Sequence, residues 1–226
     1  MFDNIAPAYD FMNRAMSFGL HKLWLRRALN FIKKVNPETP WLDVATGTAD
    51  VAISLARLNP DATITGIDLS EGMLACGREK VSKAGLSHRI TLSKADCLNL
   101  PMQSESIGLV TVAYGVRNFQ QLSLGLSEMA RVLKPGGMIA VIELSTPQNP
   151  LIEPFYHLYT RHIIPLMGRI ASRDVRAYSY LPESIAAVPQ GNEMTSLLEQ
   201  AGLTNARFKA MTFGTCTLYT AFKRNN

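Results

Sequence analysis

The chain has 226 residues, of which 47% are hydrophobic and 18% are charged, and its formal net charge is +5. This length suits one α/β domain with additions, and the composition excludes a disordered or low-complexity chain. Three distant cysteines without CxxC spacing argue against a zinc site, and no apolar stretch reaches the roughly 20 residues that span a bilayer, so we expect a cytoplasmic protein.

The N-terminal segment, residues 1–36, is basic and contains the first predicted helix. It carries a charge of +4, whereas residues 41–150 carry −1. Apolar residues recur at helical spacing between Gly19 and Val35, and prolines follow. Because the positive charge is concentrated in one helix, we expect contact with an anionic membrane surface and no nucleic-acid binding.

Strands and helices then alternate through residues 41–145. The predicted strands are Trp41–Ala45, Thr63–Asp68, Ile90–Lys94, Ile107–Ala113 and Met138–Leu144. The predicted helices are Asp50–Leu58, a helix capped by Ser70 that runs to about Ala84, and Leu122–Leu133. Lys134–Gly137 are expected to form a turn. Five strands joined by helical crossovers predict a doubly wound, mostly parallel α/β sheet.

Residues 151–190 form an apolar, aromatic and proline-interrupted insertion, which we expect to be helical and to lie on the substrate side. Its apolar stripe suits a lid with a channel for a greasy tail, and suits equally a core or dimer interface. Residues 191–226 hold a helix near Glu193–Ala201 and a predicted hairpin of Ala206–Phe213 and Cys216–Phe222 at the sheet edge. We therefore expect the chain to form a single domain, residues 1–226, with a seven-stranded sheet.

The turn after the first strand, Ala45–Ala49, has one glycine where a dinucleotide-binding loop has three. Ala49 and Asp50 would stand near the diphosphate of a bound dinucleotide. Asp68 ends the second strand, where an acid suits ribose hydroxyls, and Asp96 ends the third. A sheet edge with two acids and only one glycine in its first turn favours binding of S-adenosylmethionine, which carries a sulfonium cation, over binding of NAD. Plain turns and helix caps are the alternative interpretation of these residues.

Tyr114–Asn118 follow the apolar fourth strand, at the position that faces the reacting group in this architecture. No [DN]-P-P-[YW] sequence is present, which disfavours methylation of an amine. Arg117 cannot act as a base, because a guanidinium keeps its proton in proteins, but it can stabilise an oxyanion. An ordinary salt bridge is the alternative role for this arginine.

Three motifs resemble the ubiquinone/menaquinone biosynthesis C-methyltransferase family. Tyr9–Trp24 resembles its Y-D-x-M-N-x-x-x-S-x-x-x-H-x-x-W signature, Arg131–Gly137 its second signature, and Gly115–Asn118 its G-x-R-N element. The resemblance covers nearly the whole chain. It implies a class I S-adenosylmethionine-dependent methyltransferase fold and methyl transfer to a ring carbon of a polyprenylated quinol.

The resemblance and the strand-end positions together give a set of expected site residues. The expected cofactor-binding residues are Tyr9, Ala45, Gly47, Thr48, Asp68, Leu69, Asp96, Cys97 and Ala113. The expected catalytic residues are Arg117 and Asn118, and we expect no metal. The candidate proton acceptors are His21, Asp10 and a water held near Arg117 and Asn118. The Tyr9–Trp24 segment is expected to close over the site. The family often has G-T-G-D where this chain has Gly47–Asp50, so backbone approach to the cofactor is expected to differ slightly.

The acceptor ring is interpreted as a naphthoquinol, demethylmenaquinol, because the T-G-T-A-D loop is more like the menaquinone branch. A benzoquinol of ubiquinone biosynthesis is the first alternative. A non-catalytic scaffold that holds quinol intermediates is the second, and another acceptor such as a sterol or RNA is the third. A homodimer is compatible with the apolar insertion.

Overall fold

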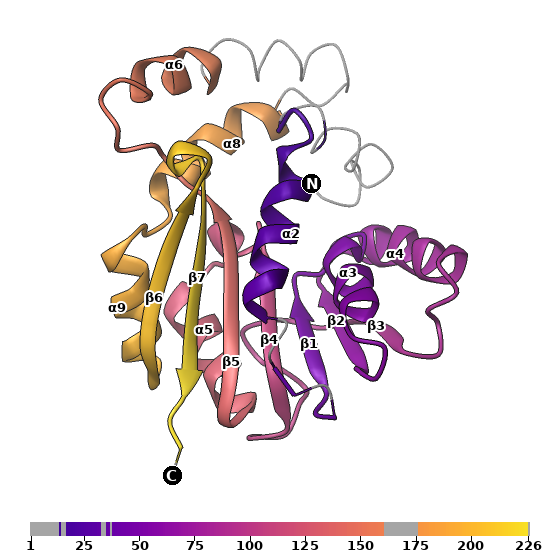
Figure 1. Cartoon of the computed structure of the whole chain (residues 1–226). Coiled ribbons are helices and arrows are strands. Elements are labelled where there is room, and N and C mark those ends of the chain that lie inside the picture. The colour runs from indigo at the N-terminus through magenta and orange to yellow at the C-terminus, as the bar shows by residue number, and fades with distance from the viewer. Residues whose placement is uncertain (1–13, 15–16, 33–34, 37, 161–175, 226) are drawn as a thin grey trace.

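The computed structural model describes residues 14, 17–32, 35–36, 38–160 and 176–225 (Figure 1). Within this part, seven strands form one sheet in the order β3-β2-β1-β4-β5-β7-β6. The strands are β1 Trp41–Val44, β2 Ile64–Asp68, β3 Ile90–Lys94, β4 Ile107–Ala113, β5 Leu133–Leu144, β6 Leu203–Met211 and β7 Cys216–Lys223. The first five pair in parallel, and β7 pairs antiparallel with both β5 and β6. The predicted doubly wound sheet with an antiparallel edge hairpin is therefore confirmed.

Helices cover both faces of this sheet (Figure 1). They are α2 Leu20–Ile32, α3 Asp50–Leu58, α4 Glu71–Lys83, α5 Leu122–Val132, α6 Glu153–Leu158, α8 Arg176–Ala187 and α9 Asn192–Gln200, with short 3-10 turns η1 Val116–Asn118 and η3 Thr212–Gly214. Helices α2, α3 and α4 pack on one face, and α5 and α9 pack on the other. Helices α6 and α8 lie beyond the carboxyl end of β5, at the top of Figure 1.

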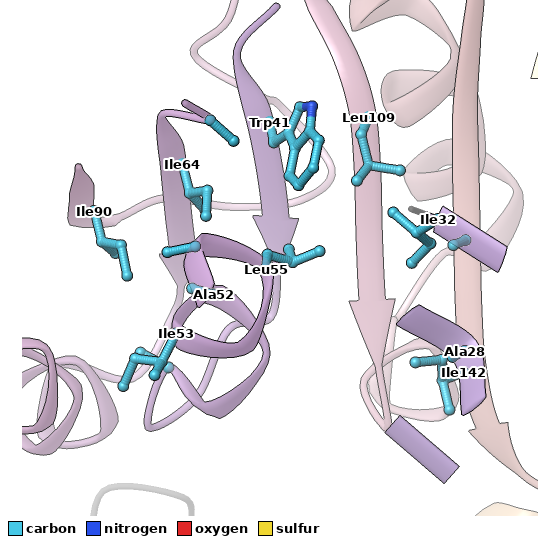
Figure 2. Packing of buried hydrophobic residues seen from close by; sticks show 14 of the residues in the cluster. Ala28, Ile32, Trp41, Ala52, Ile53, Leu55, Ile64, Ile90, Leu109 and Ile142 are labelled. Atoms are coloured by element: carbon cyan, nitrogen blue, oxygen red, sulfur yellow. The ribbon is translucent and has the colours of Figure 1, made fainter. Parts of the chain in front are cut away.

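The core on the α2–α3 face is built from apolar stripes at helical spacing (Figure 2). Trp24, Ala28 and Ile32 are all buried and recur every four residues, so α2 presents one apolar face to the sheet. Strand β1 is buried along its whole length, as expected for a central parallel strand. The Trp24 indole Nε1 donates a 2.8 Å hydrogen bond to Thr212 Oγ1, which ties α2 to the turn between β6 and β7.

The predicted cap of α4 is present. The Ser70 hydroxyl accepts a 3.2 Å hydrogen bond from the Met73 backbone N–H, in the usual N-cap geometry. A cap of this kind contributes about 1 kcal/mol to helix stability. The helix ends at Lys83, and Gly85 follows in the left-handed region with φ +71°. Local sequence signals therefore fix both ends of the helix that follows β2.

The predicted turn at Lys134–Gly137 is wrong, because these residues lie inside β5 as a bulge. Ile107 pairs with Leu133 and Leu109 pairs with Met138, so four residues of β5 lie opposite Gly108 alone. Gly136 has φ +74°, a conformation that favours glycine. The chain therefore loops out and rejoins the same strand instead of starting a new one.

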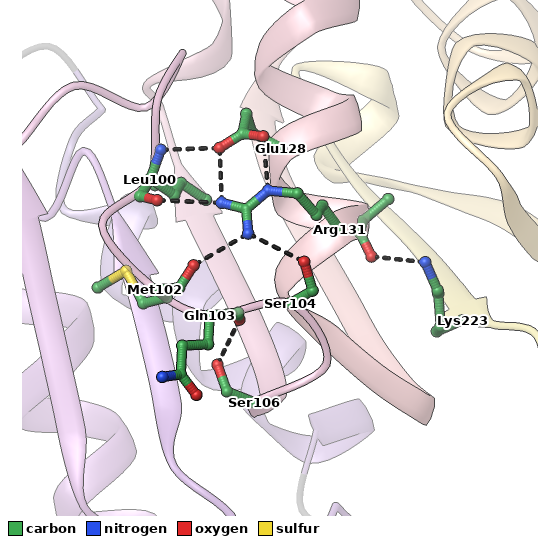
Figure 3. Close-up of polar contacts among 9 residues, drawn as sticks. Leu100, Met102, Gln103, Ser104, Ser106, Glu128, Arg131 and Lys223 are labelled. Atoms are coloured by element: carbon green, nitrogen blue, oxygen red, sulfur yellow. Dashed lines mark hydrogen bonds and ion pairs between the residues drawn. The ribbon is translucent and has the colours of Figure 1, made fainter.

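Arg131, the first residue of the Arg131–Gly137 motif, connects the loop between β3 and β4 to α5 (Figure 3). Its Nε and Nη2 donate to the Glu128 carboxylate at 2.7 and 2.8 Å. Its Nη1 donates to the Met102 carbonyl, and its Nη2 also donates to the Leu100 carbonyl, both at 3.0 Å. Glu128 accepts a further 2.8 Å bond from the Leu100 N–H. This network, which we call the Arg131 clamp, stabilises the fold at a distance from the strands' carboxyl ends.

Candidate active site

A cavity of about 220 Å³ opens at the carboxyl ends of β1, β2, β3 and β4. Most of the residues predicted to bind the cofactor line it. These are Ala45, Gly47, Asp68, Leu69, Asp96, Cys97 and Ala113. Asn118, one of the predicted catalytic residues, lines it too. Residues from four separate loops therefore converge on one cavity, as expected at this edge of a doubly wound sheet.

Asp68 joins two of these loops. One carboxylate oxygen accepts a 2.9 Å hydrogen bond from the Gly47 N–H, and the other accepts one of 2.9 Å from the Ser70 N–H. A carboxylate has about four acceptor positions, so this side chain keeps capacity for the two hydroxyls of a ribose. The adjacent Leu69 and Met73 give the cavity an apolar side. These residues fit the nucleoside half of S-adenosylmethionine.

The turn after β1 is conformationally strained. Ala45, Gly47 and Ala49 all have positive φ, of +52°, +54° and +66°. Only glycine adopts this region without cost, so the two alanines are held there by their surroundings. A side chain at Gly47 would meet no atom within 4 Å, so this glycine serves the turn conformation and not tight packing.

Asp43, which sequence reasoning missed, supports this turn from below. Its carboxylate accepts hydrogen bonds from the Thr46 and Thr111 hydroxyls at 2.6 and 2.7 Å. Burial raises its pKa to about 6, although these hydrogen bonds act in the opposite direction. The available signal was an acid in an otherwise apolar, fully buried strand. Asp43 does not line the cavity, so its contribution is to hold Thr46 and the turn.

Thr48 is not among the residues that line the cavity, so its expected place at the cofactor stays a prediction. Its buried hydroxyl accepts a 3.0 Å hydrogen bond from Lys80 Nζ on α4. The same ammonium group forms an ion pair with Asp50. Ala49 is buried and also lies outside the cavity lining. Asp50 lies outside the cavity lining too, at the start of α3.

Cys97 and Asp96 form the wall after β3. Burial raises the pKa of the Cys97 thiol to about 12, and the neighbouring Asp96 carboxylate acts in the same direction. The thiol therefore stays protonated at neutral pH and contributes packing, not nucleophilic chemistry. One Asp96 oxygen accepts a 2.9 Å hydrogen bond from the Leu98 N–H, which shapes this loop.

Arg117 lies behind the cavity wall and is held by a partner that sequence reasoning missed. Its Nη1 forms a 2.6 Å ion pair with Glu143 Oε1 on β5 and donates to the Tyr114 carbonyl at 2.6 Å. Tyr114, Gly115 and Asn118 line the cavity, whereas Arg117 itself does not. An acid near the end of the apolar strand β5 was the signal for this pair.

The predicted N-terminal residues divide into two groups. Tyr9 and Asp10 lie outside the described residues. His21 is described: its Nδ1 lies 2.7 Å from the Ser17 hydroxyl, and the residue is absent from the cavity lining. The centroids of the Phe18 and Tyr159 rings lie 5.5 Å apart, so the turn before α2 contacts the chain just after α6.

Two further observations concern the described residues only. None of their helices is both long and apolar enough to cross a bilayer. Among the same residues, no three His, Cys, Asp or Glu side chains gather in a way that could hold a metal ion.

Comparison with known proteins agrees with this geometry. The chain is 46% identical to demethylmenaquinone methyltransferase of Bacteroides fragilis, over 99% of this chain and 91% of that protein. It is 42% identical to ubiquinone/menaquinone biosynthesis C-methyltransferase UbiE of Geobacter sulfurreducens, over 99% and 87%. Its fold is similar to that of a SAM-dependent methyltransferase from Aquifex aeolicus, with a TM-score of 0.64, 20% identity and 88% coverage of both chains. The profile of the ubiE/COQ5 methyltransferase family matches residues 1–223, and the chain therefore belongs to that family.

Proposed function

We propose that this protein transfers a methyl group from S-adenosylmethionine to a ring carbon of demethylmenaquinol, forming menaquinol and S-adenosylhomocysteine. The observation that carries the proposal is the cavity at the carboxyl edge of β1–β4, where Asp68 joins the turns after β1 and β2. Full-length similarity to a demethylmenaquinone methyltransferase supports the choice of acceptor.

Different residues of the cavity would bind different parts of the cofactor. Asp68 would hold the ribose hydroxyls, and the loop of Asp96–Leu98, which lines the cavity, would contact the adenine. The strained turn at Ala45 and Gly47 would hold the amino acid portion. S-adenosylmethionine supplies an electrophilic methyl group on a sulfonium ion. Because Ala113 and Asn118 line the same cavity, the residues at the end of β4 would lie beside the quinol that accepts the methyl group.

The acceptor carbon becomes a good nucleophile when the neighbouring quinol hydroxyl, with a pKa near 10 for a phenol, loses its proton. The ring carbon then forms a bond to the methyl carbon, and the methyl–sulfur bond breaks to leave a neutral thioether. Loss of the ring proton restores the aromatic ring, and return of a proton to the oxygen gives the methylated quinol. In this proposal Asn118, which lines the cavity, aligns the ring, and the charge of Arg117 behind the cavity wall stabilises the oxyanion. Asp10, His21 or a water held near Arg117 and Asn118 accepts the hydroxyl proton.

We assign residues 1–36 and 151–190 as the two segments that close over the quinol. The contact between Phe18 and Tyr159 supports this assignment, because it joins the two segments at the carboxyl end of the sheet. Helix α8 also contacts η1, which carries Arg117 and Asn118. Closure of this kind excludes water from a reactive phenolate.

Contact with a membrane surface is the route by which a polyprenylated quinol reaches the site. Leu151, Phe155 and Phe213 are highly exposed. They belong to the turn before α6, to α6 and to the β6–β7 turn, and α6 and the β6–β7 turn lie at the same end of the molecule (Figure 1). Replacing these three side chains by serine should abolish flotation with anionic liposomes. Turnover of a quinol with a short, soluble tail should persist in that variant, and its loss would contradict a membrane role.

The experiment that tests the function uses purified protein, demethylmenaquinol and S-adenosylmethionine with a deuterated methyl group. We expect mass spectrometry to detect menaquinol carrying the label. A demethylated benzoquinol is the second acceptor to assay, because the Geobacter sulfurreducens relative is named for both pathways. Labelling of neither quinol, in the presence of tight adenosylhomocysteine binding, would leave a cofactor-binding scaffold and contradict the proposal.

A further inference from the structure

We propose that Glu143 is a positioning residue of this site: it fixes Arg117, and through Arg117 the Tyr114–Asn118 turn, and it sets the charge behind that wall of the cavity. The inference rests on the proposed function and adds a residue that neither the family signatures nor the lining of the cavity identify. Glu143 does not line the cavity, so its effect is exerted through Arg117.

Three hydrogen bonds place the Glu143 carboxylate. Oε1 accepts from Arg117 Nη1 at 2.6 Å and from the Leu144 N–H at 2.8 Å. Oε2 accepts from the Arg117 backbone N–H at 3.3 Å. The carboxylate therefore binds both the side chain and the backbone of the same arginine. A residue held at both points cannot change its orientation without breaking at least one of these bonds.

The turn that Arg117 holds needs such support. Tyr114 has φ +57°, an unfavourable conformation for a residue with a bulky side chain. Its carbonyl accepts the 2.6 Å hydrogen bond from Arg117 Nη1. The linkage thus runs from Glu143 through Arg117 to Tyr114, and Tyr114, Gly115 and Asn118 form the cavity wall. Loss of the first member releases the strained turn.

The pair is also almost fully buried. The side chains of Arg117 and Glu143 are only 9% and 2% exposed. Among the described residues, Cys216 and Tyr219 on β7 also interact electrostatically with Glu143. Burial raises the pKa of both groups and the carboxylate raises it further, so both stay neutral. Arg117 is therefore the cation that balances Glu143 among these groups.

This balance sets the effect of Arg117 on a quinol. A guanidinium alone would strongly favour the phenolate form of a nearby hydroxyl, whereas a guanidinium paired with a carboxylate favours it less. Neutralising Glu143 should therefore lower the pKa of the bound quinol. Shortening Glu143 by one methylene should keep its charge and disturb only the position of Arg117. Two substitutions of Glu143, one that removes its charge and one that shortens it, thus separate the effect of its charge from its effect on the position of Arg117.

The test compares Glu143→Gln and Glu143→Asp with Glu128→Gln, which removes the carboxylate charge of the Arg131 clamp. For each protein we would measure the thermal midpoint, adenosylhomocysteine affinity by calorimetry, and kcat and KM across pH. For Glu143→Gln we expect kcat to fall ~100-fold, as for a misplaced catalytic geometry. We expect the acid limb of its kcat–pH profile, where activity rises as the quinol loses its proton, to move about one pH unit lower. The reason is that the charge of Arg117 is then no longer balanced by Glu143.

Glu143→Asp should lose kcat with the acid limb at the wild-type pH, and neither Glu143 variant should change adenosylhomocysteine affinity. Glu128→Gln should keep both kcat and the acid limb. If the Glu143 variants lose activity only in proportion to their folded fraction, with the acid limb unmoved, the positioning role is wrong. The same holds if Glu143→Gln has wild-type kcat.

A readout independent of turnover separates this inference from the proposed function. The Arg117 backbone amide donates to Glu143, so its NMR resonance should move in both Glu143 variants and stay in place in Glu128→Gln. Should the wild type fail to methylate a quinol while this resonance moves, the methylation proposal fails and the positioning of Arg117 stands. An unmoved resonance would overturn the positioning role whatever the activity.

Discussion

Two arginine–glutamate pairs lie in different regions of this protein and have different consequences. In the Arg131 clamp the side chains of Arg131 and Glu128 are 35% and 17% exposed, and the arginine also binds two loop carbonyls. The pair of Arg117 and Glu143 is almost fully buried, next to the cavity wall. Two pairs of the same residue types therefore have different roles. The Arg131–Glu128 pair holds the β3–β4 connection, and the Arg117–Glu143 pair supports the wall of the candidate site.

The comparison shows that burial and neighbours, not residue type or motif membership, decide what a charged pair does. Arg131 belongs to a signature motif yet acts on the fold, whereas Glu143 belongs to no signature and acts on the site. A buried pair is sensitive to loss of one partner, because the other charge is then left without compensation in a low dielectric. An exposed pair is screened and contributes less.

The largest expected effect is that of Arg117→Lys. A lysine keeps the charge but cannot reproduce the directed donors that bind Glu143 and the Tyr114 carbonyl together. We expect kcat to fall by roughly 10²–10³, as when an oxyanion-stabilising donor is removed. Adenosylhomocysteine affinity should hardly change. Steady-state kinetics with calorimetry checks this, and near-wild-type turnover would contradict a role for Arg117.

The next effect concerns the cofactor side of the cavity. Asp68→Asn keeps the size of the side chain but removes the charge that accepts from the Gly47 and Ser70 N–H groups. Hydrogen bonds to charged groups contribute about 1.5–3 kcal/mol, so adenosylhomocysteine should bind roughly ten- to 100-fold more weakly. Calorimetric titration measures this, and unchanged affinity would remove Asp68 from the cofactor site.

A pH effect is expected from Asp43. Its pKa is raised from 3.8 to about 6 by burial, so the folded state binds the proton more tightly than the unfolded state. Wild-type stability should therefore decline as pH rises between about 4 and 6, by up to about 3 kcal/mol for a shift of this size. Asp43→Asn should lack this decline in denaturant titrations at a series of pH values. Parallel curves for the two proteins would contradict the assignment.

The smallest effect is expected at the Arg131 clamp. Glu128→Gln should destabilise the fold by about 1 kcal/mol, as for a partly exposed ion pair, and leave kcat unchanged. The Arg131 hydrogen bond lowers the pKa of Glu128. Its stabilising effect is therefore present above the unfolded-state pKa, so the difference from wild type should shrink as pH falls through the acid range. Thermal melts at acid and neutral pH measure this.

Local signals predicted most of the fold because they depend on residues close in sequence. The apolar fourth strand, the Ser70 cap and the alternation of strands with helices all lie where expected. The bulge in β5 was missed because glycines at Lys134–Gly137 look the same in a turn and in an outward loop of one strand. Only the pairing of both flanks with β4 tells the two apart.

The site was predictable where a residue ends a strand. Asp68, Asp96 and Ala113 were expected at the cavity from their positions, and they line it. Asp43 and Glu143 were missed because each has a partner that is distant in sequence: Thr111 for the first and Arg117 for the second. An acid inside a buried strand is the signal that both share, and it reveals that a partner must exist without revealing which one.

The measurement that tests the central claim most directly is the incubation of purified protein with demethylmenaquinol and methyl-deuterated S-adenosylmethionine. The structure and the family lead us to expect that the intact label appears on the quinol ring, with equimolar adenosylhomocysteine. Tight cofactor binding without any labelled menaquinol or ubiquinol precursor would contradict the claim that this cavity performs C-methylation.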